Sequence, residues 1–572
     1  MGRKLQSKQT SKKRNDKENS RFIVQRRKEL AVRVDKVLKL TSIFQATGNL
    51  SKSWELHKQV DSLIKEIINI ESSIISKNER TQRKSCIEKY VNWLQENGAV
   101  FEGVEISEFE GYELGLKANK NFMEGSLILT VPTKVMMTEK NAQESELKTF
   151  IDIDPLLQNM PNITLALFLL LEKTNTESFW KPYIDVLPNK YSTILYFTPD
   201  ELAELKPSPV FESSLKLYRN ITRQFAYFYN KIHSLDLPVL RKLQDIFTFE
   251  NYRWAVSTVM TRQNNIQLSN TNVTAFIPLW DMCNHEHGKI TTDYNAELDR
   301  GECYALRDFK AGEQIFIFYG TRPNSDLFLH NGFVYPNNQH DSLSLALGVS
   351  AGDPLRDTKL SLLTKLGLAG VAHFHLYRGP APVGAELLAF IRIFNMNQGK
   401  LGLSNESKPS NVTIFRYIPV ITYSGINILI PLYVAMKSKA LNALTYISLF
   451  TLLLKTPTSY TFANTDAGKT LYIINIIEEL AEWSSQGLPG DLVSSEPASS
   501  QAVGVAIDRR AYTYLHTRCG LLKASYKKSE DEPDSIHRKN IHLLKECEVQ
   551  ILDGAIEYLQ DVLQKLPTSS EK

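Results

Sequence analysis

The segment IPLWDMCNHEHG, residues 277–288, gathers side chains that can do chemistry. It holds a Trp, an Asp, a Cys, an Asn and two His, in a chain with only 11 His and 5 Cys. Three kinds of site are consistent with this set: a metal centre, a nucleophilic cysteine, or a pocket for another ligand.

The spacing argues against the first two kinds of site. His285 and His287 are two residues apart, which on a strand places both on one face. A zinc site needs three or four ligands, however, and the sequence shows no recognised spacing for the others. Cys283 has no protease-like signature around it that would supply a positioned base. A buried thiol is the simpler interpretation of Cys283, and a pocket for another ligand remains.

The chain that positions this segment has the composition of an ordinary globular protein, with 42% hydrophobic and 23% charged residues. Its 572 residues exceed one compact core, so we expect two or three domains. The five cysteines include no CxxC pair, which indicates a reducing compartment, and we expect the cytoplasm. No apolar segment adjoins the N-terminal charges, so the sequence predicts neither a secretory signal nor membrane insertion there.

The charge is distributed unevenly along the chain. Residues 1–28 hold eleven Lys or Arg against Asp16 and Glu18, whereas the remainder has 56 basic and 61 acidic residues. We interpret residues 1–30 as a solvated, disordered tail, whose runs Lys12-Lys13-Arg14 and Arg26-Arg27-Lys28 are also a candidate nuclear address. A protein with nucleic acid as its main partner would have a basic body, and this body is mildly acidic.

Hydrophobic periodicity predicts several helices. Apolar residues of segment 54–70 fall on one helical stripe, and a second helix is expected over 86–96, ending at Asn97-Gly98. Two more are expected over 163–173 and 215–232. A late helix is predicted by the stripe of Ile541, Leu544, Ile551, Ala555, Leu559 and Val562.

Two other stretches have the period of strands. Residues 104–132 alternate apolar and polar residues, with a turn at Glu124-Gly125 and a strand over 127–131. Residues 304–320, YALRDFKAGEQIFIFYG, repeat the pattern with a turn at Ala311-Gly312. We therefore expect two similar hairpins in a small β-rich domain that a helical insert interrupts, which is an α+β fold.

Asn284-His285, followed by the hairpin AGEQIFIFYG that carries Tyr319, resembles the paired signature of SET-domain methyltransferases. In that family the two segments cross in a knot-like arrangement beside S-adenosylmethionine. The resemblance covers about residues 80–400, returns near 509–532, and extends to the branch that methylates a histidine of actin. Further matching segments are FWKPYIDVLP (179–188), RQFAYFYNKI (223–232), YRWAVSTVMTRQNNI (252–266) and IFYGTRPNSD.

The resemblance implies methyl transfer from S-adenosylmethionine to a histidine of actin, the protein substrate. It assigns three catalytic residues: Asn264 holds the acceptor ring, Trp280 walls the acceptor pocket, and Tyr319 orients the acceptor at the methyl channel. Lysine, with a pKa near 10.4, would first have to lose a proton, at about 4.6 kcal/mol at pH 7. Imidazole is already mostly neutral, so an amide that holds its tautomer suits the task better than a base.

The resemblance also implies a cofactor-binding set. Arg83 and Arg262 would meet the carboxylate of S-adenosylmethionine, and Asn284 and His285 would touch the cofactor through side chain and backbone. The rest of the implied set is Tyr112, Glu113, Leu114, Asp281, Met282, Cys283, Asn331, Gly332 and Phe333.

Two positions depart from the family pattern. The family has a Glu-Gly-aromatic-Gly run at its first strand turn, whose glycines let the backbone approach the cofactor. Here the run is Tyr112-Glu113-Leu114-Gly115, with Glu113 in place of the first glycine. Asn331 stands where the family has Ser before Gly332-Phe333, which keeps a hydrogen-bonding side chain.

The expected domains follow from these comparisons. After the tail at 1–30 we expect N-terminal helices at 31–100, a SET domain at 101–336 with a helical insert at about 140–250, and an all-α substrate-binding domain at 337–572. The resemblance lapses at about 405–508, where residues 417–436 and 440–454 carry no charge. Pro and Gly residues interrupt this apolar region, so we interpret it as an insertion or a gene-model artefact rather than a membrane segment.

Two other functions stay open. One is a lysine methyltransferase of the same fold, as in plant-type relatives with a helical C-terminal domain, against which Asn264 and Trp280 argue. The other is a catalytically silent SET-like scaffold that binds partners through its C-terminal helices, for which Glu113 argues. Whichever of these functions holds, histidine methylation included, we expect a monomer without a metal site or a membrane segment.

Overall fold

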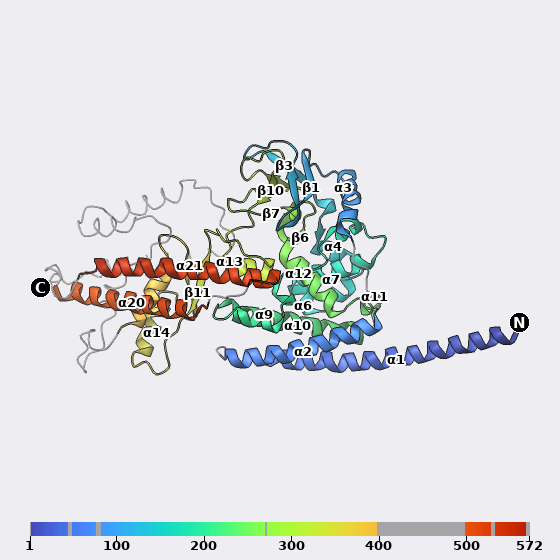
Figure 1. Ribbon diagram of the computed structural model, residues 1–572, viewed down its shortest axis with the longest axis horizontal. Coiled ribbons are helices and arrows are strands. Elements are labelled where there is room, and N and C mark those ends of the chain that lie inside the picture. Colours follow the sequence, from blue (N-terminus) through green and yellow to red (C-terminus); the bar gives the residue numbers. More distant parts are fainter. Residues whose placement is uncertain are drawn as a thin grey trace, which may run out of the picture. The chain divides into compact units, whose positions relative to one another are not determined.

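The computed structural model describes residues 2–43, 49–75, 82–268, 271–396, 498–527 and 532–567 (Figure 1). The chain divides into two compact units. Unit 1 comprises Met1–Leu345, His375–Pro382 and Cys519–Ile556, and unit 2 comprises Ala346–Phe374, Val383–Arg518 and Glu557–Lys572. The expectation of one C-terminal domain over 337–572 is therefore wrong, because residues 519–556 pack with the strands and helices of unit 1.

The expected apolar insertion, including residues 417–454, lies almost entirely outside the described residues. Among the helices that are described, none is both long enough and apolar enough to cross a membrane.

Unit 1 begins with the helices α1 (Gly2–Ser42), α2 (Leu50–Ile74), η1 (Arg83–Cys86) and α3 (Ile87–Glu96) (Figure 1). The expectation of a disordered tail at 1–30 is wrong, because α1 already begins at Gly2. Its later part is anchored by the buried Leu30, Val34 and Val37. Residues before an anchored helix join it without a new nucleation step, and Lys, Arg, Glu and Gln are good helix formers.

The predicted boundaries of α2 and α3 are close to the observed ones. The apolar stripe of α2 is buried as expected, at Leu56, Val60, Leu63, Ile64 and Ile67. Helix α3 ends at Glu96, and Gly98 has a φ of 85°, which is the left-handed conformation that a glycine adopts after a helix.

Three small sheets form the β-rich part of unit 1. One has the strand order β1-β2-β10-β7, the second β3-β9-β8, and the third β4-β6-β5. The strands and short helices of this part are β1 (Val104–Phe109), β2 (Glu113–Ala118), β3 (Leu127–Pro132), η2 (Thr133–Val135), β4 (Met137–Thr138), β5 (Asn264–Leu268), β6 (Thr271–Phe276), η4 (Trp280–Met282), β7 (Asn284–His285), β8 (Thr292–Asn295), β9 (Arg300–Tyr304) and β10 (Gln314–Ile317).

The two strand segments have the expected turns but a different pairing. Gly125 and Gly312 have φ of 75° and 94°, which a glycine adopts without strain. Strand β2, however, pairs antiparallel with β10, and β3 pairs antiparallel with β9. The two segments therefore pair with each other across the helical insert, and the local hairpin is the one between β1 and β2.

The helical insert occupies the chain between β4 and β5, as expected. Its long helices α7 and α12 pack together, and α10 packs against α1 and α2. The insert comprises α4 (Glu139–Glu144), α5 (Lys148–Ile151), α6 (Pro155–Asn159), α7 (Pro161–Thr174), α8 (Lys181–Val186), η3 (Ile194–Tyr196), α9 (Pro199–Glu204), α10 (Val210–Ser234), α11 (Pro238–Gln244) and α12 (Phe249–Arg262).

The remaining elements follow β10. They are α13 (Asn324–Asp326), η5 (Leu327–Asn331), β11 (Ser342–Ala346), α14 (Arg356–Lys365), β12 (His373–Tyr377), α15 (Ala385–Phe394), α20 (Ala498–Ser525) and α21 (Ile536–Lys565). Within unit 2, Arg392 of α15 forms an ion pair with Asp508 of α20 at 2.6 Å. In α21 the predicted stripe from Ile541 to Leu559 is buried.

Candidate functional site

A strained turn at Leu279 directly precedes the segment 280–285, all of whose residues belong to the predicted site. Leu279 is fully buried and has φ 70° and ψ −50°, and the amide of Trp280 donates to the carbonyl of Pro278 at 2.9 Å. This is a γ-turn of the rare positive-φ form. The amide of Leu279 donates to the Tyr90 hydroxyl at 2.6 Å. A non-glycine residue in such a conformation costs about 1–3 kcal/mol, so the surrounding core holds the start of the segment in place.

The segment then crosses the strand that leads to Tyr319. Strand β7 runs parallel to β10, with Asn284 opposite Phe316 and His285 opposite Ile317. The amide of Tyr319 donates to Nδ1 of His285 at 3.2 Å, and the Tyr319 hydroxyl donates to the carbonyl of Cys283 at 2.7 Å. These bonds join residues 283–285 and 316–319 into one structure, which is the crossing that the sequence predicts.

His285 is buried among aromatic rings. The ring centroids of Phe318, Tyr319, Phe333 and Tyr335 lie 5.1–6.0 Å from that of His285. Burial lowers the pKa of His285 to about 4, so the imidazole is neutral at pH 7. Because Nδ1 accepts the Tyr319 amide, the ring proton sits on Nε2.

Arg262 and Asp281 form a buried ion pair beside this crossing. Nη1 of Arg262 donates to the backbone carbonyl of Asp281 at 2.6 Å and lies 3.5 Å from its Oδ2, which accepts the Tyr183 hydroxyl at 2.5 Å. Burial by itself would lower the pKa of Arg262. The charge of Asp281 acts in the opposite direction, and together with the nearby tyrosines it leaves the pKa above its usual value. Oδ1 of Asp281 and Nε of Arg262 are buried without a partner within the described residues.

A second guanidinium approaches the first. Nε of Arg83 donates to the carbonyl of Val186 at 2.8 Å, and its Nη1 donates to Glu113 at 2.7 Å. Burial lowers the pKa of Arg83, and the charge of Arg262 lowers it further, whereas Glu113 opposes both effects. Guanidinium groups are the side chains best suited to pair with a carboxylate or another planar anion.

The turn before β2 lies close to β7 and β10. Asn284 Nδ2 donates to the carbonyl of Leu114 at 3.3 Å, and the ring of Tyr112 meets that of Phe316 edge-on at 5.6 Å. A Cβ at Gly115 would lie 2.5 Å from the side chain of Gln314 and 2.9 Å from that of Asn284, so a side chain here would have to displace both amide groups. The structure therefore brings 112–115 together with Asn284.

Residues 331–333 complete the set of predicted cofactor residues. Asn331 accepts a hydrogen bond from Arg322 at 3.1 Å, and the Phe333 ring lies 6.0 Å from His285. Gly332 has a φ of 77°, and a Cβ there would lie 2.7 Å from the backbone of Ser192. Its carbonyl accepts the hydroxyl of Ser192 at 2.7 Å, so the helical insert supports this turn.

Comparison with known families identifies the β-rich part. Residues 113–320 match the family described as SET domain. This part of the chain has the fold of a SET domain. Residues 350–411 match the family described as Rubisco LSMT substrate-binding. The expected α+β fold class, a SET domain with a helical insert and a helical C-terminal region, is confirmed. The expectation that the C-terminal domain is all-α is wrong, because that range also contains the strands β11 and β12.

Curated relatives confirm the resemblance inferred from the sequence. The chain is 44% identical over 357 residues to the actin-histidine N-methyltransferase of Gallus gallus, covering 62% of this chain and 60% of that protein. It is 43% identical over 358 residues to the protein of the same name from Danio rerio, with 62% and 60% covered. The match thus spans about 60% of the length of these relatives.

Solved structures show the same fold at low sequence identity. The structure of Rubisco LSMT bound to AdoMet has a TM-score of 0.57 at 19% identity, covering 84% of this chain and 93% of that one. The SET domain of LSMT bound to lysine and AdoHcy has a TM-score of 0.55 at 20% identity, covering 84% and 92%.

The three residues predicted to be catalytic in the SET domain differ in their surroundings. The Tyr319 hydroxyl is bonded to Cys283 as described. Asn264 begins β5, and its Nδ2 donates to the carbonyl of Arg262 at 3.1 Å, which fixes the amide next to the buried ion pair. The ring of Trp280 is 6% exposed and would lie 3.3 Å from a Cβ at Gly301. Such close packing is typical of an aromatic residue in the core. The place of Trp280 in an acceptor pocket therefore stays a prediction.

The remaining predicted residues of the SET domain are buried. Met282 and Cys283 are 5% and 1% exposed. A hydrogen bond with the Cys303 thiol, together with burial, raises the pKa of Cys283 well above its usual range. A thiol that stays protonated is a poor nucleophile, in agreement with the interpretation of Cys283 as a structural cysteine.

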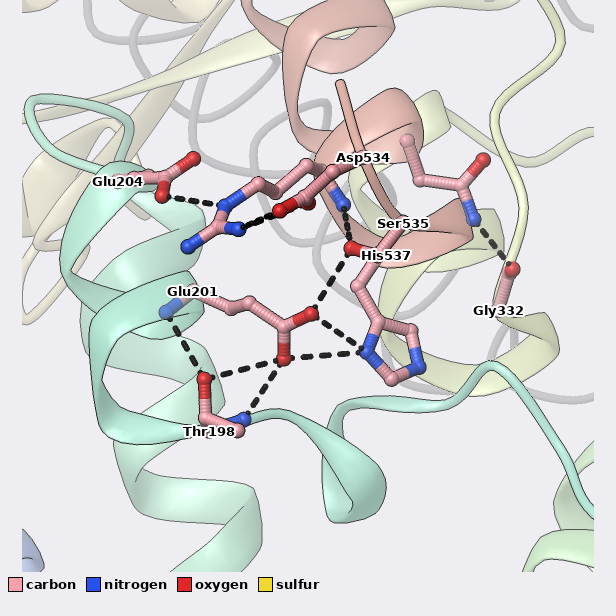
Figure 2. A network of polar contacts seen from close by, with 9 residues as sticks. Thr198, Glu201, Glu204, Gly332, Asp534, Ser535 and His537 are labelled. Carbon is pink, nitrogen blue, oxygen red and sulfur yellow. Dashed lines mark hydrogen bonds and ion pairs between the residues drawn. The ribbon is translucent and has the colours of Figure 1, made fainter.

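The first half of helix α21 docks onto the insert of the SET domain (Figure 2). Glu201 accepts hydrogen bonds from Ser535 at 2.9 Å and from His537 at 3.1 Å, and Arg538 pairs with Glu204 at 2.8 Å. Further along the helix, Asn540 donates to the carbonyl of Gly332 at 2.8 Å. Helix α21 thereby reaches the turn that carries three of the predicted cofactor residues.

Sequence reasoning did not single out several residues that support the site. Tyr183 bonds to Asp281. The partly buried Tyr191 is close enough to Arg262 and Arg83 for both charges to oppose the rise in its pKa that desolvation causes. Ser192 and Asn540 hold Gly332. The two tyrosines lie in or next to the quoted stretch FWKPYIDVLP, but no local pattern indicates the long-range role of Asn540.

Proposed function

We propose that this SET-domain protein transfers a methyl group from S-adenosylmethionine to a histidine of actin. The observation that carries the proposal is the crossing of residues 283–285 with 316–319 beside the paired guanidinium groups of Arg83 and Arg262. It is supported by the 44% identity to proteins named actin-histidine N-methyltransferase.

The residues of the site fit S-adenosylmethionine. Two guanidinium groups suit its carboxylate, and buried polar atoms without a partner among the described residues, Oδ1 of Asp281 and Nε of Arg262, lie beside them. The polar backbone of 112–114 and of 331–333 lies near the same crossing. The bound cofactor would supply a methyl group on a positively charged sulfur.

The protein's own groups would bind and orient. Arg83 and Arg262 would hold the cofactor carboxylate, while Asn284 and His285 would contact the cofactor from β7. Tyr319 donates its hydroxyl proton to the carbonyl of Cys283, so the lone pairs of its oxygen are available to the reacting groups. Methyl transfer depends on in-line alignment and on exclusion of water, and the aromatic rings around His285 exclude water from this wall of the site.

Asn264 would select histidine over lysine. Its Nδ2 is held by the carbonyl of Arg262, so Oδ1 points away from that bond and can accept an N–H from the acceptor ring. Accepting this proton keeps the ring nitrogen that is methylated free of hydrogen, and it stabilises the positive charge that develops on the ring.

The decisive experiment is to incubate the purified full chain with unmodified actin and isotope-labelled S-adenosylmethionine. We expect one labelled methyl group on a histidine of actin, located by mass spectrometry of the modified peptide. Label on a lysine would favour the lysine methyltransferase alternative. Cofactor binding by calorimetry without any labelled actin would contradict the proposed substrate, and no cofactor binding would favour the scaffold.

We also propose a location and a state for the protein. Cys86, Cys283, Cys303 and Cys547 are free thiols, which supports a reducing compartment such as the cytoplasm, and the basic N-terminal runs support an additional nuclear pool. We propose that it acts as a monomer that binds actin directly. Microscopy of the tagged full chain and its elution volume with and without actin test these points.

A further inference from the structure

Glu113 holds Arg83 from an exposed and strained position. The side chain of Glu113 is 80% exposed, whereas that of Arg83 is 14% exposed. The backbone of Glu113 has a φ of 60°, a conformation that glycine adopts readily and other residues rarely do. Among the residues that the structure describes, the hydrogen bond recorded for its carboxylate is the one from Arg83.

The neighbouring ion pair, between Arg262 and Asp281, is buried instead of exposed. Asp281, the partner of Arg262, is only 2% exposed and is also held by the Tyr183 hydroxyl. The two guanidinium groups thus have one fixed carboxylate, Asp281, and one solvent-exposed carboxylate, Glu113. A pair with one solvent-exposed partner exchanges that partner more easily than a pair in which both partners are buried and hydrogen-bonded.

Arg83 would keep its place if Glu113 moved away. Its Nε donates to the backbone carbonyl of Val186 at 2.8 Å, a bond that does not involve Glu113. Departure of the Glu113 carboxylate would leave the two guanidinium groups with one carboxylate, that of Asp281, which pairs with Arg262. A second carboxylate arriving from solution would restore the balance of charge.

We propose that Glu113 is an internal competitor that occupies Arg83 in place of the carboxylate of the methyl donor and thereby weakens the binding of that donor. This inference rests on the proposed function, because it takes S-adenosylmethionine to be the ligand. It predicts a specificity: a ligand with the amino-acid carboxylate must displace Glu113, and a ligand without it need not.

The test uses the full chain, calorimetric titration and two probes. S-adenosylhomocysteine carries the amino-acid carboxylate, and 5′-methylthioadenosine lacks it. The variant Glu113→Gln removes the competing charge, and Glu108→Gln is the matched control, because Glu108 pairs with the adjacent Lys84 at 2.7 Å and not with Arg83. We expect Glu113→Gln to bind S-adenosylhomocysteine about three- to tenfold more tightly than the natural chain, the scale of one exposed ion pair and one charge repulsion.

The controls distinguish this effect from others. Glu108→Gln should leave both affinities unchanged, and Glu113→Gln should leave the affinity for 5′-methylthioadenosine unchanged. In an Arg83→Gln background the change at Glu113 should have no effect, as a double-mutant cycle requires of a direct interaction.

Three results would overturn the proposal. Weaker binding of S-adenosylhomocysteine by Glu113→Gln would show that the carboxylate holds the ligand's ammonium group or positions Arg83. An equal gain for both probes would show an effect unrelated to the ligand carboxylate. Binding of S-adenosylhomocysteine by none of the proteins would overturn the proposed function itself, and the competitor with it.

Discussion

Replacing Gly332 by alanine tests whether the turn at 331–333 is as tightly packed as its geometry indicates. Gly332 has a φ of 77°, and an added Cβ would lie 2.7 Å from the backbone carbon of Ser192 and 2.9 Å from its carbonyl oxygen. The left-handed conformation costs a non-glycine residue about 1–2 kcal/mol. Crowding of a packed region adds about 1–3 kcal/mol, because backbone atoms cannot step aside. We expect Gly332→Ala to lower the free energy of unfolding by about 2–5 kcal/mol.

Gly125 provides a matched control. Its φ is 75°, but a Cβ there would meet nothing within 4 Å, so Gly125→Ala should lose only the conformational part, about 1–2 kcal/mol. Urea unfolding followed by tryptophan fluorescence measures both variants, and calorimetry with S-adenosylhomocysteine should show weaker binding only for Gly332→Ala. Equal destabilisation by the two substitutions would refute the assignment of crowding to Ser192.

Three further predictions follow. Asn264→Ala should lower histidine methylation of actin by about 100-fold, the scale of losing one preorganised hydrogen bond in a transition state, while calorimetry shows nearly unchanged cofactor affinity; equal loss of both would show that the role assigned to Asn264 is wrong. Asn540→Ala should remove one buried hydrogen bond to Gly332 and lower the free energy of unfolding by about 1 kcal/mol. Its affinity for S-adenosylhomocysteine, measured by calorimetry, should be a few-fold weaker. An unchanged affinity would contradict the idea that α21 supports this turn. Burial raises the pKa of Glu548 to about 8, so the folded chain binds more protons than the unfolded chain between about pH 4.5 and 8, and stability falls as pH rises through this window. In urea unfolding, Glu548→Gln should therefore be more stable than the natural chain at pH 8, and the two should have similar free energies of unfolding at pH 5. A difference in stability that stays constant between pH 5 and 8 would contradict the raised pKa of Glu548.

The sequence predicted those parts of the fold that depend on neighbouring residues. Helix α3 and its end at Asn97-Gly98 follow from local rules of capping, and the turns at Gly125 and Gly312 follow from the need for positive φ. The pairing of β2 with β10 did not follow, because a period of two shows which face of a strand is buried but not which strand lies beside it.

The candidate site shows the same division. The crossing of Asn284-His285 with the strand before Tyr319 was predicted through resemblance, and the structure contains it. The γ-turn at Leu279 was missed, because leucine carries no signal for positive φ. The contact of Asn540 with Gly332 was also missed, since the two residues are 208 positions apart and neither belongs to a local motif.

The contact between Asn540 and Gly332 has a consequence for the order in which the protein is made. A ribosome adds about 5–20 residues per second, so the 208 residues that separate the two positions take about 10–40 s to synthesise. During that interval the strands of the SET domain have already emerged, but the helix that completes their support does not yet exist. Completion of this part of the fold must therefore wait for residues near 540, and chaperones have this time to bind its uncovered surface.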